Sequence, residues 1–132
     1  MKQVKTEKTR RTVKALPGPK LDLPGIYRDG GMAAIGALFD GYRGSLESFQ
    51  AIGCQPRAGE IDEFDVEADR AFLICDQIAG YLMARETFAD FDKCIAAAIV
   101  ADWCRISGEL VTELVARVAR IAALPDETSA EL

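Results

Sequence analysis

Carboxylates crowd one short stretch of the 132-residue sequence, between Glu60 and Asp69. Six acidic residues in ten positions could bind magnesium, because carboxylate oxygens are ligands that this cation prefers. Asp65, Asp69 and Asp76 could also face Glu86, Asp90 or Asp102. However, these spacings give no matched pair of metal-binding motifs, and acidic residues at a helix start oppose the positive end of the helix dipole. We therefore interpret the stretch as a helix N-terminus and assign no metal ligand.

The usual catalytic constellations are missing from the sequence. The chain has no histidine, which removes the commonest general base near neutral pH. Gly30-Gly31 lacks the lysine and hydroxyl residue of a phosphate-binding loop, and no nucleophile elbow is present. We assign no catalytic residue and no cofactor, so an enzyme that uses carboxylates and a divalent metal is only the third hypothesis.

The four cysteines have none of the short paired spacings of zinc sites. Three of them lie among apolar helical neighbours, where a reduced thiol acts as a small hydrophobic group. The first 20 residues contain no apolar signal core, and no run approaches the roughly 20 apolar residues that span a bilayer. The sequence predicts a cytoplasmic protein with free thiols and no membrane contact.

Positive charge is concentrated in an N-terminal arm of residues 1–24. The arm has seven basic and two acidic residues, a charge of +5, whereas residues 25–132 have nine basic and nineteen acidic residues, a charge of −10. Such an arm could contact nucleic-acid phosphates, or the acidic body of its own or a neighbouring subunit, or remain a solvated tail. The candidate phosphate contacts are Lys5, Lys8, Arg10, Arg11 and Lys14.

A segment from Gln77 to Leu82, followed by a helix opening near Thr87, imitates a helix-turn-helix. Asp90 and Asp92 begin the would-be recognition helix, and their charge opposes a phosphate backbone. The arm is therefore the better nucleic-acid candidate, and possible DNA binding rests on it.

Apolar periodicity predicts an all-α fold of three to four helices in residues 25–132, after an arm and linker rich in proline and glycine. The first helix is expected from about Gly31 to Ile52, with a kink or close crossing near Gly41. The second is expected from the acidic stretch to about Arg85. Thr87 has the spacing of a capping box for the next helix.

The last apolar stripe keeps its phase across Ser107-Gly108. We therefore favour one long helix from about Phe88 to Ala123, with two helices hinged at Gly108 as the alternative. A long helix would leave an apolar face uncovered, which a dimer or higher oligomer would bury. The predicted interface consists of Trp103, Ile106, Leu110, Leu114, Val118 and Ile121.

These observations favour a non-enzymatic helical protein–protein interaction module, such as an adaptor, assembly factor or regulator, that acts as an oligomer and binds an unidentified protein. The alternative is a nucleic-acid-associated oligomer of a plasmid, phage or chromatin complex that grips phosphates with its basic arm. No motif in the chain is specific to a known family.

Overall fold

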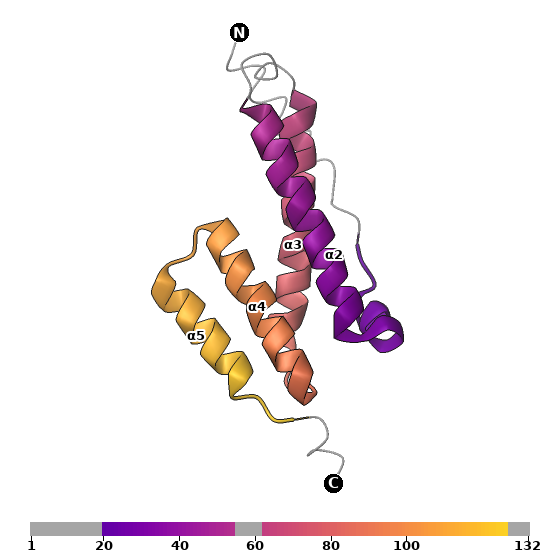
Figure 1. Cartoon of the computed structure of the whole chain (residues 1–132), viewed down its shortest axis with the longest axis vertical. Helices are drawn as coiled ribbons and strands as arrows, with labels where there is room; N and C mark the ends of the chain where they lie inside the picture. Colours follow the sequence, from indigo (N-terminus) through magenta and orange to yellow (C-terminus); the bar gives the residue numbers. More distant parts are fainter. Residues whose placement is uncertain (1–19, 55–61, 127–132) are drawn as a thin grey trace. The chain divides into compact units, whose positions relative to one another are not determined.

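The computed structural model describes residues 20–54 and 62–126, and these ranges are all-α, as the sequence predicts. The helices are α2 (Leu23–Gly53), α3 (Asp62–Ala84), α4 (Asp90–Ser107) and α5 (Val111–Ala122) (Figure 1). Within the described residues, no helix combines the length and apolar character needed to cross a membrane.

The chain divides into two compact units, and α2 and α3 each contribute residues to both. Among the described residues, the first unit comprises 20–21, 40–54 and 62–75, and the second comprises 22–39 and 76–126. The second unit contains all of α4 and α5 and most of the buried side chains. Its large, fully buried residues are Ile35, Phe39, Ile78, Leu82, Phe88, Val100, Cys104 and Ile121.

Helix α2 begins at Leu23, eight residues before the predicted start near Gly31. Asp22 caps it, because its carboxylate accepts a 3.2 Å hydrogen bond from the Gly25 amide while its carbonyl accepts the first helical bond from Ile26 at 2.9 Å. Pro24 fits the first turn, where its missing N–H costs nothing. The Asp-Leu-Pro-Gly sequence is therefore a helix start rather than a linker.

Gly31 interrupts α2 with φ 69° and ψ −168°, a conformation that only glycine adopts readily. The predicted kink near Gly41 is wrong, since Gly31 is the one non-helical residue inside α2. A Cβ on Gly41 would meet nothing within 4 Å, so no close helix crossing occurs there either.

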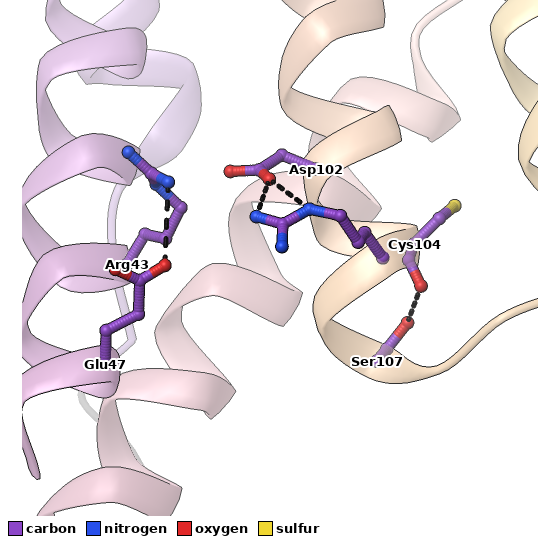
Figure 2. Close-up of polar contacts among 6 residues, drawn as sticks. Arg43, Glu47, Asp102, Cys104 and Ser107 are labelled. Atoms are coloured by element: carbon purple, nitrogen blue, oxygen red, sulfur yellow. Dashed lines mark hydrogen bonds and ion pairs between the residues drawn. The ribbon is translucent and has the colours of Figure 1, made fainter. Parts of the chain in front are cut away.

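Helix α3 covers Asp62–Ala84, close to the range that the sequence predicts. Much of the acidic stretch falls in its first two turns. Residues 55–61 of the preceding loop lie outside the described ranges. In the first unit, i,i+3 and i,i+4 ion pairs join Arg70 to Glu67 at 3.9 Å and Arg43 to Glu47 at 3.6 Å; Figure 2 shows the second pair.

Helix α4 begins at Asp90 with Ala89 as its N-cap, and no side chain caps it. The predicted capping box at Thr87 is therefore wrong. Thr87 instead lies in the connection from α3, where its carbonyl accepts a 3.2 Å hydrogen bond from Arg85 Nε.

The long C-terminal helix is also wrong, because the chain reverses at Gly108 and the two-helix alternative holds. Gly108 has φ 77°, and the amides of Gly108 and Glu109 donate to the carbonyls of Arg105 and Cys104 at 3.4 and 2.9 Å. This is a Schellman motif, which ends α4. Helix α5 then packs back along α4 (Figure 1).

Two short-range polar contacts accompany the end of α4. Arg105 donates two hydrogen bonds to Asp102 Oδ1, at 2.6 Å from Nη2 and 3.1 Å from Nε. The Ser107 hydroxyl donates to the Cys104 carbonyl at 3.2 Å, as Figure 2 shows. Both contacts pair polar groups within the last turns of the helix.

A polar clasp joins the elements of the second unit where α3 leads into α4. The Tyr27 hydroxyl of α2 donates to Asp92 of α4 at 2.7 Å, and the Arg85 guanidinium lies 4.2 Å from the Tyr27 ring centroid. The Phe88 amide donates to the Pro125 carbonyl at 3.4 Å, so the chain after α5 returns to the same connection. The second unit is thereby closed around buried Phe88.

Candidate interaction surface

Helix α5 turns one narrow face toward its own unit. Ile121 is buried, and Leu114 and Val118 are half-buried, at positions that share one side of the helix. The Leu114 amide donates to the Leu110 carbonyl at 3.0 Å, so Leu110 is the N-cap residue and begins the helix. Apart from Arg117, the remaining positions of α5 are exposed.

The outward side of α5 carries a second apolar stripe, which we call the α5 flank. Its N-terminal members, Val111 and Val115, are large and are 74% and 58% accessible, and the N-cap residue Leu110 next to Val111 is 71% accessible. Ala119 and Ala122 continue the same side at three- and four-residue intervals and are also exposed. The flank contains no charged residue, so nothing in it opposes burial against another protein.

Such exposure has an energetic consequence. Burying a valine or leucine side chain fully contributes about 1.5–3 kcal/mol, and these three residues leave most of that gain unused. The two alanines would allow the backbone of a partner helix to approach closely. The flank therefore combines large apolar side chains at one end with a smooth surface at the other.

Arg117 lies on the opposite side of α5 and reaches several groups of the second unit. Its Nη1 is 2.9 Å from the Met83 sulfur, its Nη2 is 3.6 Å from a Glu109 carboxylate oxygen, and its guanidinium is 5.5 Å from the Trp103 ring centroid. Its buried Nε has no hydrogen-bond partner among the described residues. The arginine thus holds α5 against α3 and α4 with poorly matched acceptors.

Arg120 follows one turn later on the same side of α5. Its Nη1 donates a 2.7 Å hydrogen bond to the Met83 carbonyl, which belongs to the last turn of α3. Carbonyls in that turn lack helical partners and carry the negative end of the helix dipole, so a cation stabilises them. Together Met83, Arg117 and Arg120 line a hollow of about 220 Å³.

Trp103 and Cys104 lie beneath this corner of the second unit. Trp103 is 7% exposed, and its indole Nε1 has no hydrogen-bond partner within the described ranges. Burial raises the pKa of the Cys104 thiol above its ordinary value of 9.0, although nearby Arg117 acts in the opposite direction. The thiol therefore stays protonated and unreactive at neutral pH.

The structure places the predicted interface residues on both arms of the α4–α5 hairpin. Trp103 and Ile121 are buried within the chain, Leu110 is exposed, and the others are half-buried: Ile106, Leu114 and Val118. Because α5 folds back along α4, the hairpin itself covers much of the face that a single long helix would leave bare. What remains uncovered is the α5 flank, and of the predicted set only Leu110, at the start of α5, lies next to it.

Two further regions were considered from the sequence, the basic arm and the acidic stretch. The candidate phosphate contacts, Lys5 to Lys14, lie outside the described residues. In the described ranges, no three histidine, cysteine or acidic side chains gather closely enough to hold a metal ion. Asp69 is exposed, but partial desolvation and the neighbouring Asp65 charge still raise its pKa above 3.8.

The cysteine prediction is correct for only part of the chain. All four thiols are free, and Cys75 and Cys104 are buried, but Cys94 is exposed on α4, as is Cys54 beyond α2. Phe91, on the same helix as Cys94, is 87% exposed. An apolar sequence context therefore did not ensure burial on the outer side of α4.

Sequence reasoning missed the role of Met83 and Glu109. Both lie close to Arg117 only because α5 returns toward the end of α3, at a separation of 34 residues in the case of Met83. The glycine at 108 was the available signal, since a chain reversal there brings α5 back toward α3.

Comparisons of this chain with models of known protein families, with curated proteins and with solved structures give no match.

Proposed function

We propose that this chain is a non-enzymatic helical interaction module that binds another protein through the α5 flank. The supporting observation is the exposure of Val111 and Val115 on one uncharged side of a helix, with the exposed N-cap residue Leu110 next to them. An amphipathic helix normally presents one apolar side to its own core, whereas α5 has a second apolar side next to the first. Adaptors, assembly factors and regulators use surfaces of this kind.

The occupant that fits this surface best is an apolar helix or helix pair. Valines one turn apart followed by alanines form a shallow ridge suited to helix-on-helix packing. That helix could belong to a second copy of the chain or to a different protein. In either case the bound state buries side chains that the described part of the chain leaves exposed.

Comparative affinity capture from the native host tests this proposal. The bait is the full chain, either unaltered or with Val111→Ser and Val115→Ser together. Serine and valine have similar helix propensities, so α5 should persist. A control bait carries Thr112→Ser and Glu113→Gln, which alter exposed positions of the same helix outside the flank.

We expect a defined set of proteins, or a second copy of the chain, to remain bound to the unaltered and control baits and to be lost from the serine variant. Circular dichroism of the three baits confirms equal helix content. If all three retain the same proteins in equal amounts, the flank is not the binding surface.

A further inference from the structure

We infer that the hollow lined by Met83, Arg117 and Arg120 is a binding site for a small oxyanion, a carboxylate or phosphate group. This site lies on the opposite side of α5 from the flank, so it stands independently of the proposed function. The first observation is electrostatic. Two arginines three residues apart line one hollow and gather positive charge there, against the net charge of −10 of residues 25–132.

The second observation is the poor pairing of Arg117. A thioether sulfur is a weak acceptor, yet it is the partner of Nη1 at 2.9 Å. The buried Nε has no partner among the described residues, and Nη2 forms only a long ion pair with a Glu109 carboxylate oxygen at 3.6 Å, which is beyond ordinary hydrogen-bond distance. An oxyanion would be a much stronger acceptor for this guanidinium than the sulfur, because arginine binds carboxylate and phosphate with paired charge-assisted hydrogen bonds.

The third observation is the setting of these donors. Arg117 is two-thirds buried, so its charge is only partly screened by water and attracts an anion more strongly than a surface arginine would. Arg120 keeps one nitrogen on the Met83 carbonyl and is otherwise exposed, which leaves its other donors available at the mouth. The volume of about 220 Å³ suits one small group and is below the roughly 300 Å³ at which pockets for drug-sized ligands begin.

Trp103 provides the reporter for a test, because it is the single tryptophan and the Arg117 guanidinium lies 5.5 Å from its ring centroid. Tryptophan fluorescence is followed while inorganic phosphate or acetate is added to the full chain. Sodium chloride at matched ionic strength is the control. We expect a saturable change with at least one of the two oxyanions and none with chloride, and the anion that acts at lower concentration identifies the preferred group.

Matched variants locate the effect. Arg120→Gln should weaken the apparent affinity by about tenfold or more, since a hydrogen bond to a charged group is lost. Arg105→Gln removes an exposed arginine that pairs with Asp102 on α4 outside the hollow, and should leave the affinity unchanged. Met83→Leu removes the sulfur but keeps the carbonyl, so the affinity should stay equal or increase.

The inference is overturned if chloride produces the same change, or if neither oxyanion gives saturation. It is also overturned if Arg120→Gln and Arg105→Gln titrate alike, or if Met83→Leu weakens binding.

Discussion

The hydroxyl of Tyr27 and the carboxylate of Asp92, 65 residues apart, form a 2.7 Å hydrogen bond between α2 and α4. The Arg85 guanidinium covers the ring of the same tyrosine. Tyr27, near the start of α2, therefore contacts both the chain after the end of α3 and the start of α4. This clasp positions the connection against which the chain after α5 closes.

Tyr27→Phe should therefore destabilise the fold by about 1.5–3 kcal/mol, because the lost hydrogen bond has a charged acceptor. Urea unfolding followed by Trp103 fluorescence measures the change. Tyr42→Phe is the matched control, since the structure gives its hydroxyl no hydrogen-bond partner among the described residues. Equal midpoints for the two variants would contradict the importance of the clasp.

Gly108 and Gly80 give a pair of predictions with opposite signs. Gly108→Ala should destabilise the fold by about 1–2 kcal/mol, because φ is 77° and an L-residue is strained there. Gly80→Ala, at an exposed position inside α3 with nothing within 4 Å of a new Cβ, should stabilise it by about 0.5–1 kcal/mol. The thermal midpoints of the two variants measure these changes. Stabilisation by Gly108→Ala would contradict the chain reversal and favour one continuous helix.

The helix content and the approximate limits of α3 could be predicted from the sequence because an apolar stripe reports which side of each helix is buried. The same signal misled at Gly108. Ile106, Leu110 and Leu114 keep their phase, but phase shows that both helices have an apolar side and does not show that they are continuous. Gly108, which follows Ser107, is a helix-stop signal and indicates that one helix ends there.

The candidate sites were less predictable for a different reason. The contact between Arg117 and Met83 depends on how two helices meet in three dimensions, which the local pattern does not contain. The start of α2 carries a local signal, because aspartate before Leu-Pro-Gly is typical of a helix cap, although proline and glycine together are equally typical of a linker.

Thiol reactivity should separate the cysteines into two classes. Cys54 and Cys94 should react rapidly with Ellman's reagent in the native protein, and Cys75 and Cys104 only on opening, because the first pair is exposed and the second is buried. Four thiols that react at one rate would contradict the burial pattern.

The raised pKa of Cys104 also predicts a pH dependence. The folded state holds the thiol proton more tightly than the unfolded state, so this contribution is fully present below pH 9.0 and is lost as the pH rises through the folded pKa. Denaturant midpoints are measured between about pH 8 and about 10.5, a range that includes thiol titration. As the pH rises, the midpoint should fall less steeply for Cys104→Ala than for Cys94→Ala. The same dependence of the midpoint on pH in both variants would contradict a raised pKa for Cys104.

Asp69→Asn should stabilise the first unit at neutral pH, because partial desolvation and the Asp65 charge raise the pKa of Asp69 and so disfavour its charged form. Most carboxylates stabilise a fold at neutral pH, but Asp69 has a raised pKa and acts in the opposite direction. Its stabilising contribution is present below pH 3.8, where it is protonated, and is lost as the pH rises through the folded pKa. Thermal midpoints at pH 7 and below 3.8 test this, with a gain expected only at pH 7. Asp76→Asn is the control, and an equal gain in both variants would contradict the assignment to the Asp65–Asp69 pair.

Photo-crosslinking from the α5 flank tests the central claim most directly. A benzophenone amino acid at Val115, in the full chain within its native host, should give a discrete adduct with another protein or a second copy of the chain. The same probe at Glu113, which is exposed on another side of α5, should not give that adduct. No adduct from position 115, or the same adducts from both positions, would contradict the claim that the α5 flank is the binding surface.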